Sequence, residues 1–139
     1  MNDFPQIEEL IPQRKPFLFV DKVLSFDGTT IQTEFVMHEN LDFFKGHFPG
    51  NPIVPGVILQ EALFQTGAAF MSLQNKEGGG LGVVTRVQNA KFKNMVRPNE
   101  KIEMQVELLE ALGNASFMKG VTKVAGKTVL VIEFAVASI

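Results

Sequence analysis

Residues 43–66 read Phe-Phe-Lys-Gly-His-Phe-Pro-Gly-Asn-Pro-Ile-Val-Pro-Gly-Val-Ile-Leu-Gln-Glu-Ala-Leu-Phe-Gln-Thr, a loop that runs directly into an apolar segment. Three prolines and three glycines share this stretch with His47 and Glu61. Proline fixes φ and removes a hydrogen-bond donor, whereas glycine permits φ > 0, so their alternation specifies one loop shape. We therefore expect a rigid loop that holds a bound group.

A helix is expected to follow this loop and to continue to residue 74. Pro55 and Gly56 suit a first helical turn, and residues 57–74 contain no proline. The segment is apolar on nearly every side, which is typical of a helix buried in the middle of a fold. Its first turn exposes free backbone N–H groups, which suit an anion or an oxygen that becomes negative during a reaction.

Glu61 lies in the second turn of this predicted helix. Burying a carboxylate without a partner is costly, so Glu61 must be paired, hydrated, protonated or beside a pocket. Gln65 follows four residues later on the same helix face, where its amide can hydrogen-bond to the acid and orient it. Together with Gln60, these polar residues near the middle of the segment argue against a membrane-spanning helix.

Length and composition indicate one globular domain over residues 1–139. With 45% hydrophobic and 20% charged residues, the chain is neither disordered nor collagenous. A net charge of −2 gives no global attraction to nucleic acid or to an anionic membrane. The absence of cysteine excludes disulfides, thiolate metal sites and cysteine nucleophiles. The amino terminus lacks a basic segment followed by an apolar run, so a cytoplasmic protein is expected.

The rest of the chain predicts strands joined by glycine, proline and asparagine turns. A short helix is expected at residues 5–10, and strands are expected at 17–26, 30–37, 81–92, 101–109, 115–124 and 128–137. Residues 75–82, which include four glycines, are expected to form the exit from the helix. The predicted order is thus β-β-helix-β-β-β-β, an α+β domain in which one antiparallel sheet wraps around one buried helix. One helix cannot cover both sheet faces and the edges, so dimerisation is also expected.

Residues 46–57 (GHFPGNPIVPGV) and 61–65 (EALFQ) closely resemble the active-site segment of the FabZ-type 3-hydroxyacyl-acyl-carrier-protein dehydratases of fatty acid synthesis. Residues 11–21 and 90–98 extend the likeness over most of the chain. The related FabA-type dehydratase-isomerases carry Asp at the acid position, so Glu61 favours the FabZ type. Two residues depart from the family pattern: Asn51 stands where many relatives have Arg, and Gln60 stands where an apolar residue is usual. These departures bear on which substrate is bound and on the wall of the pocket, more than on the chemistry.

The resemblance implies the hot-dog fold, an antiparallel sheet around a long central helix that pairs into dimers and often assembles as a trimer of dimers. It also implies removal of water from (3R)-hydroxyacyl thioesters on acyl carrier protein, which gives trans-2-enoyl thioesters. His47, held by the carbonyl of Ile53, would take the C2 proton, and Glu61 would protonate the leaving hydroxyl. In relatives the histidine of one subunit faces the acid of the other. Residues expected to bind substrate are Gly56, through its N–H, Val57, Phe48 and Gln65, which would steady the acid.

No cofactor is expected, because the phosphopantetheine arm of acyl carrier protein carries the substrate. No metal site is expected either, because His38 and His47 lack supporting carboxylate spacing. Neither nucleic acid nor a membrane is expected as a partner. Four basic side chains form a candidate rim that meets either the acidic carrier protein or only solvent: Lys45, Lys91, Lys93 and Arg97.

Three alternative functions stay open from the sequence. A hot-dog acyl thioesterase would share the fold and release free thiol without forming an enoyl product. A dehydratase of a specialised acyl, aryl polyene or polyketide pathway would share the chemistry and differ in its substrate chain. A non-catalytic subunit that binds acyl carrier protein would show tight binding without turnover.

Overall fold

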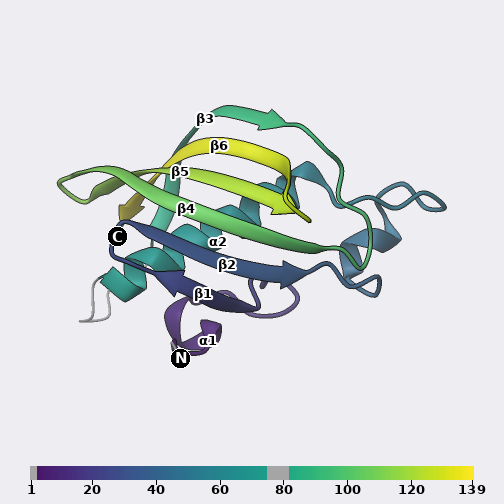
Figure 1. Ribbon diagram of the computed structural model, residues 1–139, viewed down its shortest axis with the longest axis horizontal. Helices are drawn as coiled ribbons and strands as arrows, with labels where there is room; N and C mark the ends of the chain where they lie inside the picture. Colours follow the sequence, from purple (N-terminus) through teal and green to yellow (C-terminus); the bar gives the residue numbers. More distant parts are fainter. Residues whose placement is uncertain (1–2, 75–81) are drawn as a thin grey trace.

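One antiparallel sheet curves around a long helix in this computed structural model, which describes residues 3–74 and 82–139. The six strands lie in the order β1-β2-β4-β5-β6-β3. Figure 1 shows α2 running behind the sheet, with β1 and β3 on opposite sides of it. The elements are α1 (Ile7–Leu10), β1 (Lys22–Phe26), β2 (Thr30–Val36), the 3-10 helix η1 (Asp42–Lys45), α2 (Gly56–Gln74), β3 (Gly82–Phe92), β4 (Lys101–Leu112), β5 (Ala115–Val124) and β6 (Lys127–Ser138). The predicted hot-dog arrangement is confirmed.

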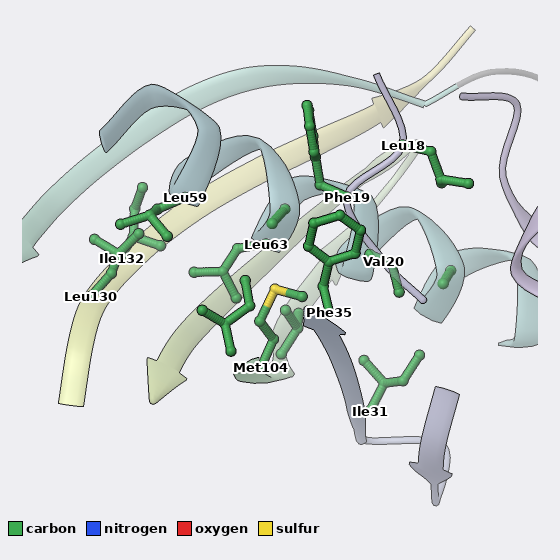
Figure 2. Close-up of a cluster of buried hydrophobic side chains, with 14 of the residues drawn as sticks. Leu18, Phe19, Val20, Ile31, Phe35, Leu59, Leu63, Met104, Leu130 and Ile132 are labelled. Carbon is green, nitrogen blue, oxygen red and sulfur yellow. The ribbon is translucent and has the colours of Figure 1, made fainter. Parts of the chain in front are cut away.

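The core lies between α2 and the concave face of the sheet. Leu63 and Phe70 of α2 are fully buried, as are Met118 of β5 and Ile132 of β6. Figure 2 shows side chains from α2, β2, β4, β6 and the segment before β1 meeting in this layer. At Gly120 a Cβ atom would lie 3.0 Å from Leu63 Cδ1, so glycine lets β5 approach the helix closely.

The segment before β1 corrects one sequence prediction. A strand was expected from residue 17, but β1 begins at Lys22. Leu18 and Phe19 are buried on consecutive positions, without the alternation of a strand that has one wet face. Their backbone bonds go elsewhere, because the side chain of Gln65 bonds both Phe17 O and Phe19 N at 2.8 Å. A helix side chain thus replaces the neighbouring strand that the prediction required.

Strand β3 ends the sheet as an exposed apolar edge. Val84 pairs with Val136 and Val87 pairs with Phe134, whose side chains are buried in the core. Cross-strand pairs lie on the same face of a sheet, so Val84 and Val87 point toward the helix side. They are nevertheless 38% and 45% exposed. The described part of the chain therefore leaves apolar surface uncovered along this edge.

The other predicted elements are confirmed with small changes in their bounds. The short amino-terminal helix is limited to Ile7–Leu10, and β4 continues to Leu112 instead of ending at 109. Residues 75–81 of the predicted glycine-rich exit lie outside the described residues. Within the described ranges, no helix is long and apolar enough to cross a bilayer.

Candidate active site

The loop before α2 is closed by two internal hydrogen bonds, one of which is made by the His47 ring. The N–H of Asn51 donates to Phe48 O at 2.9 Å, and His47 Nδ1 lies 2.9 Å from Ile53 O. A carbonyl oxygen can only accept, so Nδ1 carries the hydrogen in this bond. A neutral imidazole then has its lone pair on Nε2. The half-buried ring of His47 is thus fixed as a potential proton acceptor, with the Ile53 contact that the resemblance implied.

Phe48 stacks against this histidine in an unusual backbone conformation. Its φ is +57°, in the left-handed region that non-glycine residues rarely adopt. The ring centroids of His47 and Phe48 lie 4.3 Å apart with an angle of 35° between the planes. Phe48 is also 56% exposed, so burial within the chain does not compensate the strain. Within the described chain, its ring contacts the imidazole from this exposed position.

The start of α2 presents backbone donors beside this loop. The N–H groups of Ile58 and Leu59 donate to Pro55 O at 3.0 and 3.2 Å. Among the described residues, no acceptor is bonded to the N–H of Gly56 or Val57, as is usual in a first helical turn. A Cβ atom on Gly56 would lie 3.1 Å from the ring of Phe92, so a larger residue would crowd this position.

Glu61 is held one turn into the helix by Gln65. The Gln65 amide nitrogen donates to Glu61 Oε2 at 3.0 Å, which confirms the contact expected from their i, i+4 spacing. Burial raises the pKa of Glu61 above its ordinary value, and the hydrogen bond from Gln65 opposes that rise. A half-buried carboxyl with a raised pKa keeps its proton to higher pH than an exposed carboxyl does, which suits it to act as a proton donor.

An apolar pocket of about 340 Å³ lies beside the helix turn that precedes Glu61, and Glu61 itself does not line it. Ile58, three residues before Glu61 on the same helix, forms part of its wall. The other lining residues come from the segment before β1 and from the region of η1: Pro16, Phe17, Phe19, Leu41, Asp42 and Phe43. Sequence reasoning did not identify Phe17, Phe19 and Ile58 as pocket residues. The helical spacing from Glu61 could have identified Ile58.

Within the described chain, His47 and Glu61 form no hydrogen bond with each other. Each has its own partner, Ile53 O for the imidazole and Gln65 for the carboxyl. No cluster of three or more histidine, aspartate or glutamate side chains that could hold a metal ion occurs among the described residues.

The four predicted rim residues are all exposed but have different surroundings. Lys45 pairs with Asp42 at 3.5 Å. Arg97 donates to the side chain of Asn51 at 3.3 Å, so it lies beside the histidine loop. Lys91 is in the edge strand β3, and Lys93 follows the end of that strand. The structure thus links Arg97 directly to the loop through Asn51, one of the residues that depart from the family pattern.

Comparison with known proteins identifies relatives over most of the chain. The model of the FabA-like domain matches residues 11–133. The chain is 39% identical over 138 residues to the 3-hydroxyacyl-[acyl-carrier-protein] dehydratase FabZ of Bacillus velezensis, covering 99% of this chain and 98% of that protein. It is 43% identical over 136 residues to the protein of the same name from Caulobacter vibrioides, covering 96% and 86% of the two chains.

A solved structure gives the same fold at much lower sequence identity. The structure titled "The Dehydratase Heterocomplex ApeI:P from Xenorhabdus doucetiae" has a TM-score of 0.87 and 12% identity, and the match covers 99% of this chain and 93% of that one. At this identity the likeness supports the fold alone. The family match over most of the chain and the near full-length relatives above 30% identity show that the chain belongs to the FabA-like family, as a FabZ-type 3-hydroxyacyl-acyl-carrier-protein dehydratase.

Proposed function

We propose that His47 and Glu61 carry out the dehydration of the 3-hydroxyacyl thioester as its base and its acid. The chain is a hydro-lyase by family, and removal of water needs a proton acceptor for C2 and a proton donor for the C3 hydroxyl. The observation that carries the assignment is the half-buried Glu61, whose pKa is raised by burial and which Gln65 orients. His47 supports it, because the contact with Ile53 leaves Nε2 available.

In the proposed reaction, His47 Nε2 takes the C2 proton while the C–O bond at C3 breaks. Glu61 gives its proton to the departing hydroxyl, which leaves as water, and the electron pair from C2 forms the new double bond. A proton then returns from the imidazolium to the carboxylate. The N–H groups at Gly56 and Val57 are suited to stabilise the thioester oxygen as negative charge develops on it.

The active site is proposed to form between two copies of the chain. His47 and Glu61 are not bonded to each other within the described chain, and β3 leaves Val84 and Val87 exposed at an edge. Pairing of two such edges would cover this apolar surface and complete the backbone ladder. The histidine of one subunit would then face the acid of the other, and a trimer of dimers is a further prediction.

Acyl carrier protein is proposed as the partner that delivers the substrate. Phe48 contacts His47 and Val57 is exposed at the helix start, so both are proposed to contact the thioester region. The rim residues Lys91, Lys93 and Arg97 are exposed and could attract an acidic carrier. Lys45 contributes less, because Asp42 already balances its charge. Activity without a cofactor and a cytoplasmic location remain predictions.

The pocket lined by Ile58 is proposed to receive the alkyl chain of the substrate. The alkyl chain of the substrate is attached to C3, the carbon whose hydroxyl must reach Glu61. The next carbons must therefore lie close to Glu61, and Ile58, three residues before Glu61 on the helix, lines the apolar pocket. At about 30 Å³ for each group the size of a water molecule, 340 Å³ corresponds to about ten methylenes. Substrates of medium chain length are expected to use the whole pocket.

The test is to follow enoyl formation from 3-hydroxyacyl thioesters on acyl carrier protein and on coenzyme A. His47→Ala and Glu61→Gln are expected to lower kcat roughly 10²- to 10⁴-fold. His38→Ala is the matched control, because His38 is an exposed histidine outside the proposed site. Wild-type turnover by either site variant would refute the assignment. Release of free thiol without enoyl product would favour a thioesterase, and carrier binding without turnover would favour a non-catalytic subunit.

A further inference from the structure

Gln65 is a buried polar residue whose hydrogen-bonding capacity is almost fully used. Its side chain is 1% exposed. The carbonyl oxygen Oε1 accepts from Phe19 N at 2.8 Å. The amide nitrogen Nε2 donates to Phe17 O at 2.8 Å and to Glu61 Oε2 at 3.0 Å. Both hydrogens of Nε2 are therefore committed, one to the segment before β1 and one to the acid.

The orientation of the Gln65 amide is decided by the backbone of that segment. Phe19 N can only donate, so it must face the Gln65 oxygen, and Phe17 O can only accept, so it must face the nitrogen. A flipped amide would place two donors together and two acceptors together in a buried site. The amide group that faces Glu61 is consequently always a donor.

This orientation determines which oxygen of Glu61 can carry its proton. An oxygen that accepts from Gln65 Nε2 is poorly placed to hold a hydrogen toward the same donor. Oε2 therefore remains the acceptor, and a protonated Glu61 holds its hydrogen on Oε1. We propose that Gln65 is a positioning residue that ties the acid to the Phe17–Phe19 backbone and thereby makes Oε1 the oxygen that delivers the proton.

This inference rests on the proposed function, in which Glu61 is the acid. It adds that the backbone groups of Phe17 and Phe19, which lie outside the helix, set the orientation of the Glu61 carboxyl through the Gln65 amide. Phe17 and Phe19 also line the apolar pocket, so the hydrogen bonds of Gln65 join the pocket wall to Glu61. Misplacement of a reacting group by about 1 Å costs up to roughly 100-fold in rate.

The surroundings of Glu61 make pH dependence a useful readout. Residues 17–19 bring no titratable side chain to the carboxyl, and Asp42 and Lys45 of η1 pair with each other at 3.5 Å. In the proposed dimer, His47 of the partner subunit is the titratable group that faces the acid. Loss of the Gln65 donor removes the contact that favours the ionised carboxyl, so the pKa of Glu61 is expected to rise further. The alkaline limb of the rate profile should then move to higher pH.

The experiment compares Gln65→Met with Thr66→Val in the full-length enzyme. Thr66 is the next residue on α2, is equally buried, and bonds Thr33 Oγ1 at 2.9 Å without touching Glu61. Both variants remove buried hydrogen bonds that join α2 to another segment. Gln65→Met is expected to lower kcat about 10- to 100-fold with a much smaller change in KM, and to shift the alkaline limb upward. Thr66→Val is expected to lower the melting temperature while kcat and the pH profile stay those of the wild type.

A backbone variant protects the test if Gln65→Met does not fold. Replacing Phe19 by the corresponding hydroxy acid, phenyllactic acid, removes only the N–H that orients the amide and keeps the ring. This enzyme is expected to lose kcat and to show the same upward pH shift, although the altered atom does not touch Glu61. The inference would be overturned if Gln65→Met, or the Phe19 hydroxy-acid enzyme where Gln65→Met does not fold, kept the wild-type kcat and pH profile expected of Thr66→Val. Full activity of Glu61→Gln would instead refute the proposed function.

Discussion

Chain-length selectivity gives the sharpest test of the proposal that the pocket lined by Ile58 receives the alkyl chain of the substrate. Ile58 lines the pocket and is half-buried on α2. Replacement by tryptophan adds about six heavy atoms, and we expect about half of them to enter the pocket, displacing about three methylenes of substrate. At about 0.8 kcal/mol for each buried methylene, the lost binding is about 2.4 kcal/mol. This corresponds to a loss of roughly 60-fold in kcat/KM for a chain that fills the pocket.

A short substrate should escape this loss. A four-carbon chain has a single methyl group beyond C3 and does not reach the displaced region, so its kcat/KM should change by no more than about twofold. The assay is the rise in absorbance of the conjugated enoyl thioester, measured for carrier-bound substrates from about four to about twelve carbons. The ratio of kcat/KM for long and short chains within each enzyme cancels differences in active fraction.

Leu73→Trp is the matched control for this substitution. Leu73 is a half-buried aliphatic residue on the same helix, about 22 Å further along at 1.5 Å per residue. It should carry a similar cost in stability without altering the chain-length profile. The reasoning fails if Ile58→Trp lowers kcat/KM equally for all lengths, or if Leu73→Trp shifts the profile in the same way.

Three further outcomes follow from the structure. Burial raises the folded-state pKa of Glu61 above its ordinary value of 4.5, so the native state binds the proton more tightly than the unfolded chain does. The wild type therefore loses stability as pH rises from about 4.5 through the raised pKa. Glu61→Gln should gain in melting temperature relative to the wild type over that rise, and a difference in melting temperature that does not change with pH would contradict this. Val87→Glu places a charge on the exposed apolar edge of β3 and should weaken dimerisation and activity together. Sedimentation and enoyl-formation assays at decreasing protein concentration would measure both effects. A dimer that is as stable as that of the wild type would argue against pairing through β3. Gly67→Ala sets a Cβ atom 3.0 Å from the buried ring of Phe134. The overpacking, which costs about 1–3 kcal/mol, should outweigh a helix-propensity gain of about 1 kcal/mol and lower the free energy of unfolding. Chemical denaturation would measure this loss against Gly46→Ala, where the added atom meets open space.

The central helix and the contact between its Glu61 and Gln65 were predictable because their signals are local. Pro55 and Gly56 mark the helix start, and the uninterrupted apolar run predicts burial. The contact between Glu61 and Gln65 depends only on their spacing of four residues, which brings side chains together on any helix. The histidine loop was also predictable, because its prolines and glycines restrict the backbone wherever the loop lies in the fold.

The remaining features depend on contacts between residues far apart in the chain. Phe17 and Phe19 look like strand residues, and only the folded structure shows that Gln65, more than 40 positions away, takes their backbone hydrogen bonds. The pocket near Ile58 likewise exists only where three separate segments meet. The position of β3 at the sheet edge follows from the strand order, which periodicity does not encode.

The sequence by itself thus determined the helix, the loop and the residue types of the proposed acid and base. Their partners and surroundings were decided by tertiary structure. The physical reason is that backbone geometry and helical spacing act over a few residues, whereas burial, pKa and hydrogen-bond orientation depend on which distant groups fill the space around a side chain.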